Sequence, residues 1–587
     1  MKVLLFSPNA FITPHALPEA LVAQSLIKNG IEVVKIGCAG LYQDYCVSMS
    51  AASVWPTDSN EIKKQICLKC KKNNKEINDL FSFNYDSIDS YLTPADLGLI
   101  DELGGSIKAD NWIDFSYDSI PVGKYAAYEF LLNYKLNTTN LTTSEFDIYK
   151  IQIRNSLKTL IAGERLFDAI KPDRFLVYHA LYSVNHIMSA IAQKRAIPFY
   201  SMHAGSHLLH RLSEMTIFSG VQAQYLTNRS TAWFEYKKRP LSSRMVKKVS
   251  EHIGELFNAT SPWVYSVKST GKNTAQLKEY FSIDAEQKVV LATMSSADET
   301  FAGSIADALP PQQESMFPTQ LTWIESLIEW AKQYPKIILI IRVHPREFPN
   351  KREGVLSVQA KALRILFDQL PSNVKINWPD DDISLHDLLK IVDVGLNATS
   401  TVGLEMLLFG IPVIIYDPNQ FIAYPRELNC CPQNQNEYFL AIQEAIDSGL
   451  SLDHVYGVYQ WLAFRSEVVG IDIGDGFQVA QVGRLVKMTQ KILKRLGLTS
   501  TEPASLPGLK GSGNISLKNE KWLCHAITNG QESHLMDFVR TLPPYVDADL
   551  LQTKKQIQKS LRRLLLPLSR VDQPFLFRVN RLFGGIK

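Results

Sequence analysis

One stretch, residues 397–416, limits what this chain can fold into more than any other. Small hydroxyl and amide residues come first, an apolar segment follows, Gly410 ends it, and Pro412 leads into a β-branched run. This order predicts a short buried helix with a polar start, followed at once by a strand of an α/β sheet. The first amides of a helix lack partners within it and lie at the positive end of its dipole, so this helix start is expected to bind an anion such as phosphate.

The polar residues at this helix start are the first candidates for ligand contacts. Glu405 lies one turn further in, where its carboxylate can accept hydrogen bonds from the hydroxyls of a ribose. An ordinary capped helix packed on a sheet is the alternative interpretation, because Ser and Thr are common at helix starts. The other candidates are Asn397, Thr399, Ser400 and Thr401.

A second group of candidates follows residues 337–341, an apolar run that predicts a buried parallel strand. Arg342 and His344 come directly after this strand and point to one face, because one residue separates them. Pro345 then takes the chain out of the strand, and Arg346 adds a second cation. Open α/β sheets bind ligands at the carboxyl ends of their strands, so we expect these side chains at the site. A structural histidine on a loop is the alternative.

Two further loops have the same position relative to predicted strands. Ser295 and Ser296 follow the strand predicted from residue 288 to 294, and they are expected to face the phosphates from the other side of the sheet. Asp382 and Ser384 follow a strand at 375–378 and precede a helix. A solvated turn with a helix N-cap is an equally good interpretation of that second loop.

The amino-terminal residues predict a βαβ unit, with a strand at 2–6, a proline-broken loop at 7–18, a helix at 19–29 and a strand at 31–36. The glycine-rich fingerprint of dinucleotide-binding folds is missing there, which disfavours a nicotinamide or flavin enzyme. Segments rich in Ser, Thr, Pro and Gly at 257–273 and 499–516 predict linkers. We therefore expect a first α/β domain at 1–260, a second at 274–455, a returning helical segment at 456–498 and a carboxyl-terminal appendage at 517–587.

Taken together, His344-Pro345, the Ser400-Thr401 turn, Glu405 and the Gly-Ile-Pro run at 410–412 resemble the donor-binding half of GT-B glycosyltransferases. The similarity is greatest to the bacterial capsule and lipopolysaccharide group, which includes Kdo and sialic acid transferases, and it covers residues 285–420. It implies two Rossmann-like domains that face a cleft. It also implies that the His-Pro and Ser/Thr motifs bind the phosphates of a nucleotide sugar, commonly a CMP-sugar. A helix dipole and cationic side chains can offset the phosphate charge, so we expect that no metal is required.

The same resemblance directs attention to the first domain for the acceptor and the catalytic base. The first loop of a GT-B amino-terminal domain faces the cleft, which makes His15 and Glu19 candidates. His203 follows a predicted strand at 198–201, and an imidazole there titrates near neutral pH and could act as a general base. A surface loop histidine is the alternative for His203.

The resulting prediction is a cytoplasmic transferase that moves a sugar, with CMP-Kdo favoured as donor, to a glycan or lipid-linked glycan. Four alternatives remain open. They are a transferase that uses a UDP- or GDP-hexose, a CDP-glycerol-type phosphotransferase, a non-hydrolysing UDP-sugar epimerase, and a non-catalytic polysaccharide-assembly scaffold.

The net charge of +3 conceals a basic carboxyl-terminal segment. Residues 551–587 contain nine Lys or Arg and one acid, Asp572, interleaved with Leu and Phe. This composition predicts an amphipathic surface for the inner face of the cytoplasmic membrane, while a helix docked on its own protein is the alternative. A nucleic-acid partner is disfavoured, because the basic charge is confined to this segment. No apolar run reaches the roughly 18 residues of a spanning helix, and no signal peptide is recognised at the start.

Four of the seven cysteines fall close together in the first domain, with two of them in a Cys-x-x-Cys pair. Four thiolates could close a tetrahedral structural zinc site. Unliganded thiols are the alternative, because one of these cysteines ends an apolar strand, where a buried free thiol is common. The four candidates are Cys38, Cys46, Cys67 and Cys70.

Overall fold

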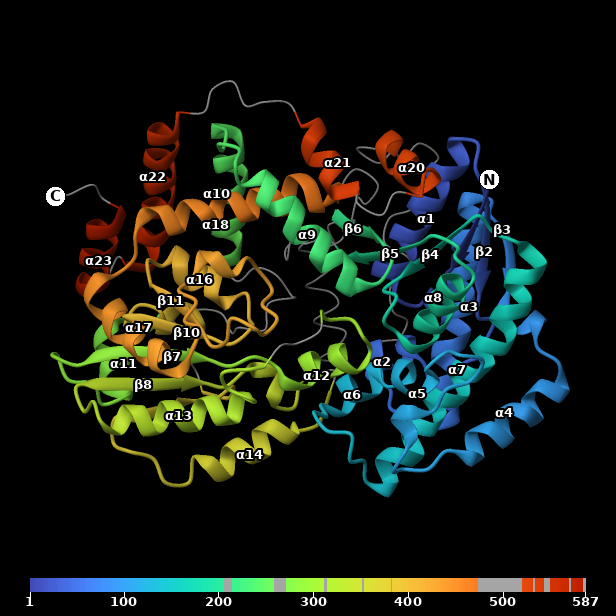
Figure 1. Cartoon of the computed structure of the whole chain (residues 1–587), viewed down its shortest axis with the longest axis horizontal. Helices are drawn as coiled ribbons and strands as arrows, with labels where there is room; N and C mark the ends of the chain where they lie inside the picture. Colours follow the sequence, from blue (N-terminus) through green and yellow to red (C-terminus); the bar gives the residue numbers. More distant parts are fainter. Residues whose placement is uncertain are drawn as a thin grey trace, which may run out of the picture.

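The structure is a computed structural model of the chain. It describes residues 1–204, 214–257, 271–310, 314–350, 353–381, 383–472, 520–530, 534–542, 549–569 and 572–583. Two α/β bodies lie side by side, with the amino-terminal body on the right of Figure 1 and the second on the left. The predicted linker at 499–516 lies outside the described residues, as does most of the one at 257–273.

The first body is built on a seven-stranded sheet of order β12-β6-β5-β4-β1-β2-β3. The strands from β3 to β5 are parallel, whereas β6 and β12 run antiparallel to their neighbours. Its strands are β1 (Lys2–Phe6), β2 (Glu32–Gly37), β3 (Asn84–Ser87), β4 (Arg174–Tyr178), β5 (Phe199–Ala204), β6 (Glu214–Ser219) and β12 (Ile471–Asp472). Its helices are α1 (Thr13–Lys28), α2 (Val47–Ala51), α3 (Asn60–Phe81), α4 (Pro94–Ser106), α5 (Val122–Ala126), α6 (Tyr128–Tyr134), α7 (Thr143–Ile170) and α8 (Ser183–Lys194).

The second body is built on a five-stranded parallel sheet of order β11-β10-β7-β8-β9. Its strands are β7 (Lys288–Thr293), β8 (Ile337–Arg342), β9 (Val374–Asn377), β10 (Val394–Asn397) and β11 (Val413–Ile415). Its helices are α11 (Thr274–Tyr280), α12 (Ala297–Ile305), α13 (Gln320–Lys332), α14 (Val358–Leu366), α15 (Leu385–Leu388), α16 (Val402–Leu408), α17 (Gln435–Ser448) and α18 (Leu452–Phe464). The predicted GT-B class, with two Rossmann-like domains, is therefore confirmed.

Both faces of the second sheet are covered by helices, which explains the continuous apolar run of β8. Ile338 and Ile340 belong to a core shared with α16 and α18, while Leu339 and Ile341 face α13 on the opposite side. The core shared with α16 and α18 also includes α9 (Gln222–Tyr236) and α10 (Ser243–Phe257). These two helices fall within the predicted first domain, which was expected to extend to residue 260, yet they pack with the second sheet.

The first loop is shorter than the sequence predicted, because α1 begins at Thr13 and not at residue 19. Two of the prolines that were taken to break the loop lie inside the helix. Pro14 is in the first turn, where the amide that proline lacks would have no partner in any case. Pro18 lies further in and is buried.

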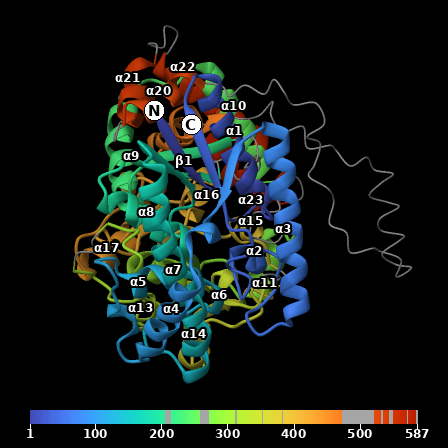
Figure 2. The same ribbon diagram turned by 90° about the vertical axis from the view of Figure 1, so that its right-hand side faces the viewer.

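Four helices are present in the described residues after 519. They are α20 (Glu520–Thr528), α21 (His534–Thr541), α22 (Leu550–Ser569) and α23 (Gln573–Phe583). Figure 2 shows α20, α21 and α22 together at one end of the molecule, with α4 and α14 at the other. The first of them packs on the amino-terminal sheet, where the Tyr200 hydroxyl donates to the Ala526 carbonyl at 3.0 Å.

The apolar side of the basic segment is covered by the protein itself. Ile557, Leu561 and Leu565 of α22 are fully buried in the core that contains α10. The one acid of the segment, Asp572, anchors α23 by accepting hydrogen bonds from the amide and hydroxyl of Thr274 at 2.7 and 2.8 Å. Docking of the apolar side on the protein is therefore what the structure has, and the exposed side of α22 is left with basic residues.

None of the helices in the described part of the chain combines the length and the hydropathy needed to cross a lipid bilayer.

Candidate functional site

The predicted donor loop lies where the strand order of the second sheet reverses, between β7 and β10. Ligands of open α/β sheets bind in the crevice at this switch point. Ser295 follows β7 and Thr399 follows β10, and the Thr399 amide donates to the Ser295 hydroxyl at 3.0 Å. Asn397 stabilises the same loop, because its buried side-chain amide donates to the Ser400 carbonyl at 2.8 Å. The structure thus places Ser295 beside the loop of Asn397, Thr399 and Ser400, which comes about a hundred positions later in the chain.

The helix after this loop, α16, carries Glu405 on its first turn. Thr401 is the residue before the helix, and its carbonyl accepts the first helical hydrogen bond, from Leu404. The carboxylate of Glu405 lies 2.7 Å from Nε2 of His386. One of its oxygens is therefore already bound within the protein. The predicted contact of this residue with a ribose stays a prediction.

Arg342 lies at the end of β8, the strand next to β7. Its guanidinium donates to the side chain of Asn377 and to the Ile383 carbonyl. Burial lowers the pKa of Arg342 to about 10, and the nearby carboxylate of Glu405 opposes that shift. Arg342 therefore keeps its positive charge at neutral pH and supplies it at the carboxyl edge of the sheet.

His344 is half-buried two residues further on. Burial lowers its pKa to about 3, and the positive charges of Arg346 and Arg342 act in the same direction. Its Nδ1 accepts a hydrogen bond from the Arg346 amide at 3.3 Å. The neutral ring then carries its proton on Nε2, so at neutral pH His344 is a hydrogen-bond donor through Nε2 and not a cation.

Arg346 has a different environment from the one expected for a phosphate ligand. Its guanidinium is 4% exposed and pairs with Asp298 at 2.9 Å and with Glu353 at 3.2 Å. It also donates to the Leu132 carbonyl of α6 at 2.8 Å, which joins the two bodies. Lys135 makes a parallel connection to the Phe348 carbonyl at 2.6 Å. These partners favour a role in holding the domains together.

The remaining candidates for binding the donor sugar nucleotide are N-cap residues of helices or lie outside the described residues. The Ser296 hydroxyl donates to Asp298 at 2.5 Å at the start of α12, and it is buried. Ser384 accepts from the Asp387 amide at 3.0 Å and so caps α15. Asp382 lies outside the described residues. The N-cap interpretation of Ser384 agrees with this geometry.

The acceptor candidates gather at the corresponding switch point of the first sheet, between β1 and β4. The ring of His15 stacks on Tyr178 at the end of β4, with a centroid distance of 4.2 Å. His203 at the end of β5 lies 4.8 Å from His179, measured between ring centroids. The sequence analysis missed His179. Its position directly after a strand, the same as that of Arg342, was the available signal, and its left-handed φ of 54° adds backbone strain of the kind that functional sites accumulate.

Glu19 lies beneath this group rather than on its surface. Its side chain is 3% exposed and accepts a hydrogen bond from the Ser7 hydroxyl at 2.5 Å. Burial raises the pKa of Glu19 to about 7, although the charge of Lys35 opposes the shift. A catalytic role for His15, Glu19 or His203 stays a prediction.

Glu129 of α6 is a second buried carboxyl, and its raised pKa can be tested through the pH dependence of stability. It accepts hydrogen bonds from the amide and hydroxyl of Ser183 at 2.7 and 2.6 Å, and burial raises its pKa to about 7. The folded state therefore binds this proton more tightly than the unfolded state, so ionisation of Glu129 costs stability above about pH 7, and the cost disappears as pH falls towards 4.5. We expect Glu129→Gln to raise the melting temperature at about pH 8 and to change it little at about pH 4.5.

Thermal unfolding of the two proteins across this range measures the effect. Glu279→Gln on the exposed side of α11 is a matched control, and it should leave the melting temperature nearly unchanged at both pH values. A constant difference between wild type and Glu129→Gln at all pH values would contradict the assignment.

The four cysteines of the predicted zinc site are free thiols in the structure. Burial raises the pKa of the Cys38 thiol to about 12 and raises those of Cys46, Cys67 and Cys70 as well, which favours the neutral form. Within the described ranges, no group of three or more His, Cys, Asp or Glu side chains is arranged to hold a metal ion. The zinc site therefore has no geometric support here.

Comparisons with known proteins return solved structures only. No protein-family model matches the chain, and no curated protein matches it at a significant level. A UDP-GlcNAc 2-epimerase from Neisseria meningitidis is 13% identical with a TM-score of 0.25, and the match covers 84% of this chain and all of that one. The spinosyn rhamnosyltransferase SpnG is 12% identical with a TM-score of 0.24, and the match covers 80% and 97%. Similarity at this level assigns no activity to the chain.

Proposed function

We propose that this chain is a GT-B glycosyltransferase that uses a nucleotide-sugar donor. One observation supports this most, namely the contact between Thr399 and Ser295 at the switch point of the second sheet, with Arg342 and a neutral His344 at the end of the neighbouring strand. Backbone amides and hydroxyls of the loop would bind the diphosphate or monophosphate, and Arg342 would offset its charge.

The proposed chemistry is a displacement at the anomeric carbon of the donor. Negative charge develops on the departing phosphate, and donors fixed in advance at that position lower the barrier. Arg342 and the Nε2 proton of His344 would supply two such donors, and no metal ion is required in this scheme. The imidazoles of His15, His179 and His203 are the proposed source of a general base, since the first sheet presents them at its own switch point.

Within this class we favour a CMP-sugar such as CMP-Kdo as donor, and a glycan or lipid-linked glycan in capsule or lipopolysaccharide synthesis as acceptor. A thermal-shift panel of CMP, CDP, UDP, GDP and their sugars tests the donor, because a ligand that binds the folded state raises its apparent melting point. A selective shift with CMP supports a CMP-sugar donor. A shift with UDP or GDP instead favours a hexosyltransferase or an epimerase. The absence of any shift favours a non-catalytic scaffold.

We also propose that the protein associates with the cytoplasmic face of a membrane through the exposed side of α22. Lys555, Lys559 and Arg563 are exposed there at helical spacing, while the apolar side is buried. Each basic residue at an anionic surface contributes about 1 kcal/mol, so reversing all three to Glu should weaken binding to anionic vesicles by about 100-fold or more. Truncation of the segment is unsuitable as a test, because it would also remove part of the core.

Vesicle sedimentation with and without anionic lipid measures this effect. The matched control reverses three exposed lysines of α3, Lys64, Lys71 and Lys72, on the other body of the molecule. Equal sedimentation of both triple variants and wild type would exclude α22 as the contact surface.

A further inference from the structure

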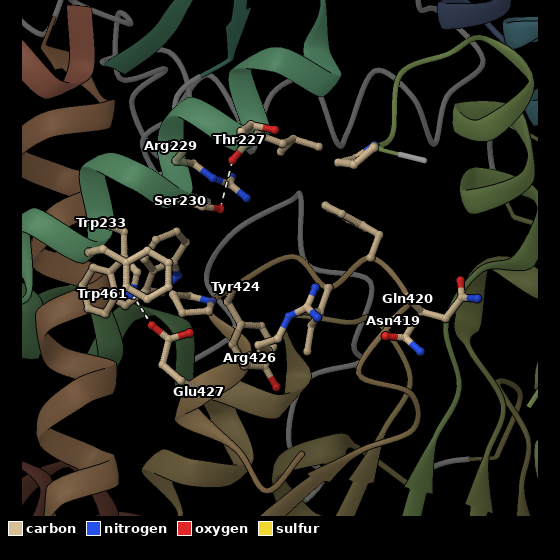
Figure 3. Close-up of a pocket in the computed structure, with 16 residues that line it drawn as sticks. Thr227, Arg229, Ser230, Trp233, Asn419, Gln420, Tyr424, Arg426, Glu427 and Trp461 are labelled. Carbon is tan, nitrogen blue, oxygen red and sulfur yellow. Dashed lines mark hydrogen bonds between the residues drawn. The ribbon is translucent and has the colours of Figure 1, made fainter. Parts of the chain in front are cut away.

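A cavity of about 430 Å³ lies between α9 and the second body, apart from the Ser295 and Thr399 contact. One wall is α9, and the opposite wall is the loop from residue 419 to 427 that follows β11. Figure 3 shows Arg229 projecting from α9 and Arg426 projecting from the loop into the space between these walls. No candidate from the sequence lies on either wall.

The cavity has a surplus of positive charge. Among the residues that the structure describes, neither Arg229 nor Arg426 forms an ion pair with a carboxylate, and Arg426 uses one nitrogen to donate to the Pro418 carbonyl. The one acid in the wall, Glu427, accepts from the Trp233 indole at 2.7 Å and from Lys237 at 3.1 Å. Its charge is thereby offset by Lys237, and both guanidinium charges remain available to a ligand.

The buried polar atoms of the walls lack acceptors rather than donors. Nε of Arg229 and Nε1 of Trp461 are buried, and neither has a hydrogen-bond partner within the described part of the chain. Buried donors without partners are costly, and native proteins usually satisfy them with protein groups, water or a ligand. No side-chain acceptor of these walls is left in the same condition among the described residues. A ligand that offers acceptors, such as an anion, fits this imbalance.

Aromatic rings give the cavity an apolar surface next to the charges. The Arg229 guanidinium lies over the Trp461 ring at 5.4 Å and over the Tyr225 ring at 5.8 Å. Trp233 packs edge-on against Trp461 with a centroid distance of 5.3 Å. Trp233 and Trp461 are each 2% exposed, so they hold the Arg229 guanidinium in a fixed position, while the half-exposed ring of Phe234 offers apolar surface to a ligand. The combination suits a sugar that carries a negative group.

The loop that forms one wall is bonded to the predicted donor loop. Tyr424 accepts a hydrogen bond from the Asn397 side chain at 3.1 Å, and the Ala423 amide donates to the Thr399 carbonyl at 3.3 Å. The cavity and the donor loop are therefore neighbours in the structure. A molecule bound in the cavity would lie beside the donor loop.

We propose that this cavity binds an anionic group, a carboxylate or a phosphate, on a sugar of the acceptor glycan, with Arg229 and Arg426 as its ligands. This inference rests on the proposed glycosyltransferase function, because it assigns the cavity to the acceptor of that reaction. The acceptor is thus a negatively charged glycan rather than a neutral one.

Isothermal titration with small probes tests the site without any turnover. Glucuronic acid and glucose 6-phosphate are titrated at millimolar concentration into wild type, Arg229→Gln, Arg426→Gln and the exposed control Arg244→Gln, with neutral glucose as the reference probe. We expect at least one anionic sugar to bind wild type and the control with similar affinity. Its affinity for each of the two cavity variants should be lower by about tenfold or more. Preference for glucuronic acid identifies a carboxylate, and preference for glucose 6-phosphate identifies a phosphate.

Equal binding of glucose, or equal affinity of wild type and both cavity variants, would overturn the proposal. Nucleotide binding is measured on the same proteins. If Arg229→Gln loses CMP binding together with the anionic sugar, the cavity belongs to the donor and the inference is wrong. If no nucleotide binds wild type but the anionic sugar still does, the proposed function fails while the site remains. Because Arg426 is exposed, Arg426→Gln carries the test should Arg229→Gln fail to fold.

Discussion

Replacing Arg346 by methionine is expected to lower the free energy of unfolding by about 3–5 kcal/mol, the usual effect of removing one partner from a buried ion pair. The side chain is nearly inaccessible and so are two of its three carboxylate partners, Asp298 (1% exposed) and Glu353 (4% exposed), while Glu299 is half exposed. Methionine fills much of the volume but removes the cation that pairs with the two buried carboxylates. The Leu132 carbonyl also loses its donor, so part of the connection between the two bodies goes with it.

Urea unfolding followed by circular dichroism measures this loss. Arg154→Met is the matched control, since Arg154 pairs with Asp101 on the exposed surface of the first body and both side chains are about half exposed. The change there should stay within about 0.5 kcal/mol. A similarly small change for Arg346→Met would show that the guanidinium does not stabilise the fold, and would return Arg346 to the ligand-binding candidates.

Replacing His344 by alanine is expected to reduce the turnover of sugar transfer by about 100- to 1,000-fold, the typical effect of removing one donor that stabilises developing charge. The Nε2 proton is the group that is lost, because Nδ1 is occupied by the Arg346 amide. The histidine lies at the ligand edge of the sheet and not in the core, so the melting temperature should change little.

Two further variants separate charge stabilisation from packing at this position. His344→Gln keeps a neutral N–H donor near the position of Nε2 and should retain more activity than His344→Ala. His454→Ala, an exposed histidine on α18, should be fully active. Because the pKa of His344 is lowered to about 3, we also expect no step from this residue in the pH profile near neutral pH. Turnover of wild-type size in His344→Ala would exclude its assigned role.

Several strands were predictable from the sequence, because they are short continuous apolar runs. The strand expected at 2–6 is β1, and the run at 337–341 is β8 with one residue added. The loop residues at the strand ends followed directly from these assignments. The predicted start of α1 was wrong. Proline breaks the interior of a helix but fits its first turn, and the sequence alone does not show which of these positions Pro14 has.

The partners of the site residues could not be predicted, because they come from distant parts of the chain. Nothing near Arg346 in the sequence shows that Asp298 will neutralise it, and Arg229 and Arg426 come from distant segments of the chain. The amphipathic pattern of residues 551–587 has the same limit. It identifies an apolar face correctly, but it does not say whether lipid or protein covers that face, and here the protein covers it, with α22 packed against α10 and α23.

The position of the last helices sets the order in which the molecule can be completed during synthesis. Leu523 and Ile527 of α20 complete the core beneath the first sheet, and Phe575 and Val579 of α23 complete the core of the second. A growing chain usually folds its amino-terminal domain first, as it leaves the ribosome. The core of the first body is therefore complete only once α20 has emerged, and the core of the second only once α23 has emerged. Until then part of the apolar surface of each sheet stays uncovered, and such exposed surface favours aggregation of the growing chain.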